Sequence, residues 1–157
     1  PKPLGVVATD LQSGERVLFR RGDTGTAVRA SSAVPGVFQP VEISGRDYVD
    51  GGLTSPVPAQ SARAMGADFV IAVDISNVRR RDRLVGTLDV LLQTFAIMGH
   101  TISLHELEDA DVVIRPQTSA VSSTSFEDRH LAILEGEQAA AAIMPELKAK
   151  LARARAR

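Results

Sequence analysis

The sequence predicts an α/β domain, and three observations lead to this prediction. Three stretches, residues 4–11, 68–75 and 111–116, are nearly continuous runs of apolar and β-branched residues, as is typical of buried strands. Residues 84–107 place apolar side chains at helical spacing. A strand over 46–49, a short helix and the strand over 68–75 also follow one another, and this order predicts a parallel crossover unit.

The first half of the chain is expected to hold a helix between two pairs of strands. Asp23 or Thr24 can cap a helix over 26–33, which ends before a Pro-Gly pair. Ser44-Gly45 is a turn that joins two strands into a hairpin. The expected strands cover 4–11 and 16–20 in the first pair, and 39–43 and 46–49 in the second.

The second half alternates helices with the remaining strands. Pro56 and Pro58 lead into a helix over 59–65. The last helix is expected over 126–142, and Pro145 kinks or restarts it. Apolar side chains of this helix are expected to cover one sheet face, namely Leu131, Leu134, Ala141 and Ile143. The basic run 78–83 and the Ser/Thr-rich stretch 117–125 are expected to be polar loops.

The composition excludes several classes of protein. The 157 residues are 44% apolar and 24% charged, which is typical of one globular domain. A net charge of −1 argues against nucleic acid as a partner. The absence of cysteine excludes disulfides, thiolate catalysis and Cys-type zinc sites. No apolar run reaches the roughly 18 residues of a membrane span. The start lacks Met and a signal peptide, so we expect the chain to begin within a longer protein. The lack of cysteine is compatible with a reducing cytosol but leaves the compartment open, and the expected location is cytoplasmic.

The candidate catalytic residue is Asp50, which follows a predicted strand and precedes Gly51 and Gly52. A strand that ends on Asp places a carboxylate at the edge of a sheet, where α/β proteins hold their sites. The glycines allow positive φ and close approach of a ligand. The alternative is an ordinary Asp-Gly turn. His100 and His105 are five residues apart, not the four that place two ligands on one helix face, so no metal site is expected.

Other carboxylates fit structural roles better. Asp10 enters a turn and can accept hydrogen bonds from its own backbone. Asp74 ends a strand like the ribose-binding acid of a dinucleotide-binding unit, but no glycine-rich loop accompanies it. The chain contains neither a P-loop nor a Gly-x-Ser-x-Gly nucleophile elbow. From the residues alone, the conclusion is an α/β domain with one well-placed Asp.

The stretches Ala30–Val41, Tyr48–Leu53 and Pro56–Pro58, with Val7–Leu11 before them and Met65–Asp74 after them, closely resemble bacterial patatin-like phospholipases. The resemblance implies a three-layer α/β/α sandwich and a serine lipid acyl hydrolase with a Ser-Asp dyad and no cofactor. In that family a glycine-rich oxyanion loop and Gly-x-Ser-x-Gly precede the Asp-Gly-Gly motif.

By that order Asp50 matches the dyad Asp, and Gly51 and Gly52 match its backbone support. Residues 1–157 would form the C-terminal part of one domain, inactive alone. The implied partners are an acyl-ester or lipid substrate, the upstream segment with the nucleophile, and a membrane surface contacted peripherally. One departure is Thr54-Ser55, where many members carry Asn. Two alternatives are a non-catalytic module that binds a lipid or a protein, and a nucleotide-binding domain that uses Asp74.

Overall fold

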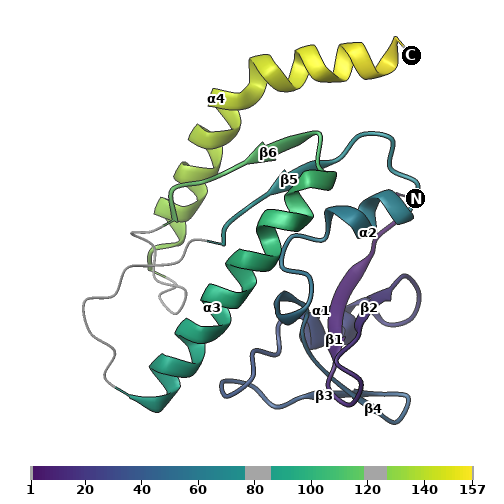
Figure 1. Cartoon of the computed structure of the whole chain (residues 1–157), viewed down its shortest axis with the longest axis vertical. Helices are drawn as coiled ribbons and strands as arrows, with labels where there is room; N and C mark the ends of the chain where they lie inside the picture. The colour runs from purple at the N-terminus through teal and green to yellow at the C-terminus, as the bar shows by residue number, and fades with distance from the viewer. Residues whose placement is uncertain (1, 77–85, 119–126, 157) are drawn as a thin grey trace.

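The computed structural model describes residues 2–76, 86–118 and 127–156 and confirms an α/β fold. Within these residues, four short strands form one antiparallel sheet and two more form a parallel pair, with helices packed around them (Figure 1). The antiparallel sheet has the order β2-β1-β4-β3. Its strands are β1 (Val6–Asp10), β2 (Arg16–Phe19), β3 (Val41–Ile43) and β4 (Arg46–Asp50).

Tight turns set the register of this sheet. Gly14, at φ +73°, lies in the turn between β1 and β2. Ser44 and Gly45 join β3 to β4 with φ values of 53° and 78°, the two positive values of a type I′ hairpin turn. The predicted hairpin is therefore confirmed. β4 lies between β1 and β3, and Asp50 is paired with Ala8 of β1.

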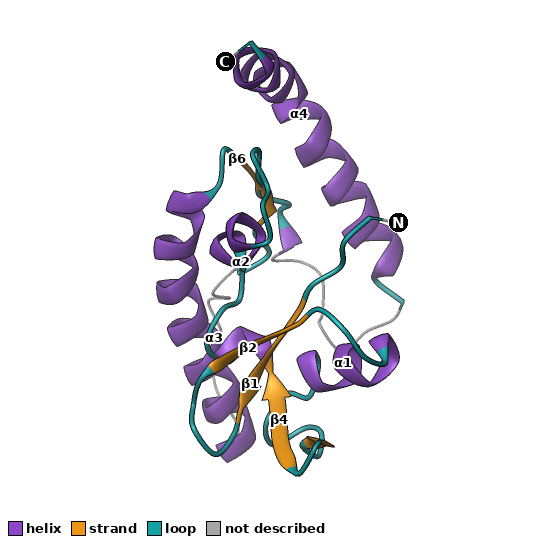
Figure 2. Ribbon diagram, turned by 90° about the vertical axis from the view of Figure 1, so that its right-hand side faces the viewer, coloured by secondary structure: helices purple, strands orange, loops and turns teal. Residues whose placement is uncertain are grey.

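Helix α1 (Thr24–Ser31) covers one side of this sheet, and α3 (Thr87–Glu106) lies on the other side (Figure 2). Asp23 caps α1 by accepting a hydrogen bond of 2.7 Å from the backbone N–H of Thr26. Small side chains let α1 approach the sheet closely. The core between them contains Ala8, Ala30, Ala33, Val41 and Tyr48.

The parallel pair consists of β5 (Ile71–Val73) and β6 (Val112–Ile114), with α3 between them in the chain. The crossover that the sequence predicted from the strand over 46–49 to the strand over 68–75 is therefore wrong. β4 already pairs with β1 on one edge and β3 on the other, so it has no free edge for β5. The helix between them, α2 (Ala59–Ala64), packs near the parallel pair instead, where Arg63 forms an ion pair of 2.5 Å with Asp111.

The last helix, α4 (Arg129–Arg155), passes through Pro145 without a break and bends in Figure 1. Its expected cover of a sheet face is wrong for its first half, because Leu131 and Leu134 are 52% and 47% exposed. The helix contacts β6, and in its second half Lys150 donates a hydrogen bond of 2.9 Å to the carbonyl of Asp111, the residue before β6.

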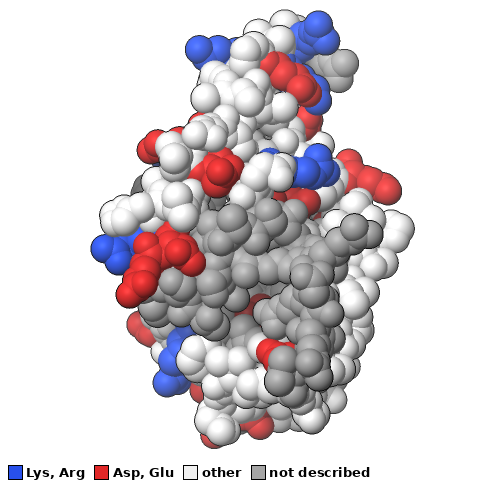
Figure 3. Space-filling view, turned by 90° about the vertical axis from the view of Figure 1, so that its left-hand side faces the viewer, with Lys and Arg blue, Asp and Glu red and all other residues white. Residues whose placement is uncertain are grey.

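The exposed surface carries mixed charge and many apolar side chains. On the face shown in Figure 3, acidic and basic side chains are interspersed, most densely toward α4. Exposed apolar residues include Ile71 and Val73 of β5 and Leu88 of α3. The predicted loop over 78–83 lies outside the described residues, and so does most of the predicted loop over 117–125. None of the helices within the described ranges is long and apolar enough to cross a membrane.

Candidate active site

Asp50 is the last residue of β4, and its backbone is fixed by three neighbours. Its N–H donates to the carbonyl of Ala33 (3.0 Å), and its carbonyl accepts a hydrogen bond from Thr9 Oγ1 (2.9 Å). Asp50 also lies opposite Ala8 in the ladder between β4 and β1. The chain then turns into a single 3₁₀ turn, η1 (Gly51–Leu53). The strand thus ends on the carboxylate, as the sequence predicts.

The Asp50 carboxyl group has one oxygen bound and one oxygen available. Oδ1 accepts a hydrogen bond of 2.7 Å from the N–H of Gly52, and no other described residue donates to the carboxyl group. Burial raises the pKa of Asp50 above its usual value of 3.8, although the Gly52 hydrogen bond acts in the opposite direction. A carboxylate with a raised pKa is a better proton acceptor than a fully solvated one.

An apolar pocket of about 280 Å³ lies beside this carboxyl group, and we call it the Asp50 pocket. Besides Asp50 its walls include Pro35, Leu53, Phe95 and Gly99. Phe38, an aromatic residue of the resembling stretch Ala30–Val41, is 61% exposed and lines none of the described pockets. The aromatic wall comes from Phe95 of α3, which follows Asp50 by 45 residues.

The two glycines after Asp50 serve a purpose different from the one the sequence suggested. Neither Gly51 nor Gly52 adopts a positive φ, so the expectation that they supply this conformation is wrong. A Cβ on Gly51 would lie 2.3 Å from the carbonyl oxygen of Val7, so only glycine lets η1 rest on β1. Gly52 brings its N–H to the carboxylate of Asp50.

Thr54, in the stretch where the resemblance implies an Asn, joins a chain of hydroxyl groups. Thr9 has one hydroxyl proton and donates it to the carbonyl of Asp50. Thr54 Oγ1, 2.9 Å away, must therefore donate to Thr9 Oγ1. The two threonines connect β1 to η1 directly below the carboxylate, so they help fix its position.

A family model for patatin-like phospholipases matches residues 5–63, the span from β1 to α2 that contains all of this geometry except α3. Over this span the chain is similar to patatin-like phospholipases. Asp50, Gly51 and Gly52 all fall within the matched span.

Several relatives carry the similarity further. A protein of the NTE family from Mycobacterium tuberculosis is 45% identical over 76 residues, which are 48% of this chain and 21% of that protein. A second NTE family protein of the same organism is 28% identical over 169 aligned positions, covering 92% of this chain and 29% of the relative. A lysophospholipase of the yeast Meyerozyma guilliermondii is 27% identical over 74 residues, 47% of this chain and 5% of that enzyme. The chain spans less than a third of each of these relatives.

In this patatin-like chain, Asp10 and Asp74 have the structural roles that the sequence favoured. Asp10 Oδ1 accepts two backbone hydrogen bonds of 3.0 Å within its turn, and its other oxygen forms an ion pair with Arg46 that holds its pKa well below the usual range. Asp74 accepts hydrogen bonds from the N–H and hydroxyl of Ser76 (3.0 and 2.5 Å) and lies 3.4 Å from Arg115. Neither carboxylate faces the Asp50 pocket.

The sequence analysis missed two residues that shape the site. His100 lines the Asp50 pocket and donates from Nδ1 to the carbonyl of Ser76 (2.9 Å). Glu106, at the end of α3, accepts hydrogen bonds from the hydroxyl of Ser55 and from the N–H of Val57 (2.9 Å). Its carboxylate thereby ties α3 to the segment that follows η1. No local pattern identifies either residue, because their partners are more than twenty residues away.

We expect Gly51→Ala to lower the free energy of unfolding by about 1–3 kcal/mol or more, because the added methyl group must displace the backbone of β1. Gly136→Ala is the matched control, since a methyl group there meets no atom within 4 Å and α4 gains about 1 kcal/mol of helix propensity. Urea denaturation of both variants measures the difference. Equal stability of the two variants would contradict the close contact with Val7.

We expect Glu106→Ala to cost about 1.5–3 kcal/mol of stability, since the Ser55 hydroxyl and the Val57 N–H both lose their acceptor. Glu108→Ala, two residues along at a side chain that is 79% exposed, should change stability by less than about 0.5 kcal/mol. Thermal and urea denaturation measure both. An effect of the same size at the two positions would show that Glu106 does not hold the loop.

Proposed function

We propose that this chain supplies the general base of a lipid acyl hydrolase that works with a Ser-Asp dyad. The observation that carries the proposal is the Asp50 carboxyl group, with one oxygen fixed by Gly52 and the other unbound within the described chain, at the wall of an apolar pocket. The match of residues 5–63 to patatin-like phospholipases supports it, as does the similarity to a lysophospholipase.

In the proposed mechanism, Asp50 accepts the proton of a serine hydroxyl as that oxygen attacks the ester carbonyl. The Gly52 hydrogen bond orients the carboxylate during this step. The proton then passes to the leaving alcohol, and water attacks the acyl-serine with Asp50 again as the base. The oxyanion would need backbone N–H donors.

The serine and the oxyanion loop belong, in this proposal, to an upstream segment of the same protein. No Gly-x-Ser-x-Gly occurs in these 157 residues, and the chain spans less than a third of its relatives. The exposed apolar side chains of β5 are consistent with further packing by that segment. We infer that the two parts together complete a three-layer sandwich, that this part alone is inactive, and that the whole protein acts in the cytoplasm at a membrane surface.

We expect Asp50→Asn in the full-length protein to lower kcat/KM for short p-nitrophenyl acyl esters by about 10²- to 10⁴-fold. The Asn oxygen can still accept the Gly52 hydrogen bond, so the fold should persist. Asp68→Asn, at an exposed position after α2, is the matched control and should keep full activity. Wild-type turnover by Asp50→Asn would refute the dyad assignment.

The raised pKa of Asp50 leads to a pH prediction of known sign. Because burial favours the protonated form, the acid limb of kcat/KM should have its midpoint above 3.8. Below pH 3.8 the carboxyl group is protonated in both folded and unfolded chains and costs nothing. As the pH rises, ionisation destabilises the folded wild-type protein, so the stability advantage of Asp50→Asn should grow and then level off. Denaturation at several pH values from 4 to 8 measures this, and a constant difference would contradict it.

A further inference from the structure

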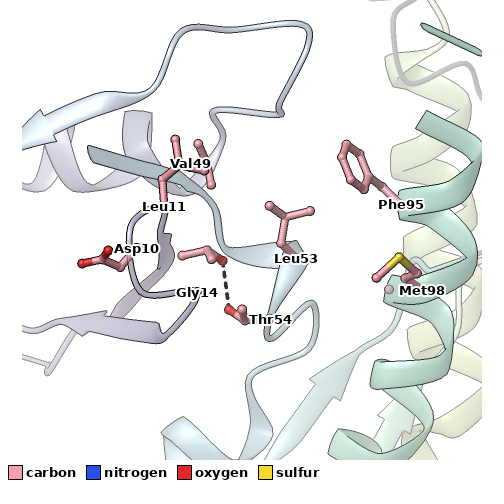
Figure 4. A pocket seen from close by; sticks show the side chains of 10 residues that line it. Asp10, Leu11, Gly14, Val49, Leu53, Thr54, Phe95 and Met98 are labelled. Atoms are coloured by element: carbon pink, nitrogen blue, oxygen red, sulfur yellow. Dashed lines mark hydrogen bonds between the residues drawn. The ribbon is translucent and has the colours of Figure 1, made fainter. Parts of the chain in front are cut away.

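A second apolar cavity, of about 310 Å³, shares part of its wall with the Asp50 pocket. It lies between the turn after β1, the 3₁₀ turn η1 and helix α3 (Figure 4). We call it the distal chamber. Successive residues of a strand point to opposite faces, so Asp50 borders the first pocket and Val49 borders the chamber. The two cavities share Leu53, Phe95 and Gly99 as lining residues.

The distal chamber presents apolar surface and no unpaired charge from the described residues. Asp10 contributes to its wall, but its carboxylate points away from the cavity (Figure 4) and is bound by Arg46 and by two backbone N–H groups. The hydroxyls of Thr9 and Thr54 bond to each other. What remains facing the space is hydrocarbon, from Leu11, Val49, Leu53, Phe95 and Met98.

Gly99 of α3 lines both cavities. A Cβ at this position would lie 3.6 Å from the carbonyl oxygen of Gly52, an ordinary van der Waals distance. Alanine would therefore fit without displacing η1. A longer side chain would extend into the space that both cavities share.

We propose that the distal chamber holds the far end of an acyl chain whose carbonyl group lies beside Asp50, and that Gly99 lets the chain pass. The inference rests on the proposed function, since that function places the ester carbonyl at Asp50. The occupant is an acyl chain because the path is apolar from the Asp50 pocket onward and opens at the exposed hydrocarbon of Leu11 and Met98. Each methylene transferred from water into such a site strengthens binding by about fourfold.

The test uses 2-alkanones of 6 to 12 carbons, because they carry a carbonyl group but cannot be hydrolysed. Isothermal titration calorimetry on the full-length protein measures their Kd values. For the wild-type protein and Gly99→Ala, affinity should increase by about fourfold per methylene through the longer ketones. For Gly99→Leu, the shorter ketones should lose less affinity than the longer ones, because Gly99 also borders the Asp50 pocket, and the gain per methylene should stop at a shorter chain length.

A second variant tests whether the result for Gly99→Leu comes from a general effect of the leucine on α3. Met98→Glu places a carboxylate at the chamber, where Met98 is already 55% exposed, and should weaken only the longer ketones. Ile97→Glu, the neighbouring exposed position that lines neither cavity, is its control and should bind like wild type. Circular dichroism and melting establish that each variant is folded.

The two proposals fail separately. Three results would each overturn the proposal that the distal chamber holds an acyl chain. They are a normal chain-length dependence in Gly99→Leu and Met98→Glu, an equal loss of affinity at every chain length, and no binding of 2-alkanones by the wild-type protein. Unchanged ester hydrolysis by Asp50→Asn would refute the assignment of Asp50 to a Ser-Asp dyad. It would not affect the conclusion drawn from the binding of 2-alkanones. Chain-length binding that responds to Gly99→Leu, together with an inactive Asp50→Asn, supports both proposals.

Discussion

The site depends on the close approach of Gly51 to β1. The Gly51 Cα lies where any Cβ would meet the Val7 carbonyl oxygen at 2.3 Å, so the backbone of η1 lies directly on the strand beside β4. That contact decides where Gly52 points its N–H, and this N–H in turn fixes one oxygen of Asp50. The carboxylate is thus oriented by main-chain geometry, which holds it with little conformational freedom.

Helix α3 adds a second constraint from a distant part of the chain. Its middle supplies Phe95 and Gly99 to the walls of both cavities, and its end anchors the loop after η1 through Glu106. One rigid element therefore sets the depth of the pocket and the position of the segment that carries Asp50. A shift of α3 along its axis would move both together, so the shape of the pocket and the orientation of the base are coupled.

Local patterns predicted the parts of the fold that local interactions decide. The I′ turn at Ser44-Gly45, the cap at Asp23 and the strand end at Asp50 all appear at the predicted places, because the relevant partners lie within a few residues. The pairing of β5 could not be read in the same way. Whether β4 has a free edge depends on β1, some forty residues earlier, and nothing near β4 records that this edge is occupied.

The same distinction separates what was right about Asp50 from what was missed. Its position followed from the pattern of a strand, an acid and two glycines, but the reason for the glycines did not. The pattern is compatible with positive φ, and only the packing of η1 on Val7 shows that the need is for space.

Glu106 has no distinctive neighbours, since its role comes from Ser55 and Val57, fifty residues away. A carboxylate that accepts two hydrogen bonds with its side chain only 10% exposed is unfavourable unless both are kept, so α3 cannot leave the Asp50 segment without a large cost. The base and the wall of its pocket are therefore held as one unit.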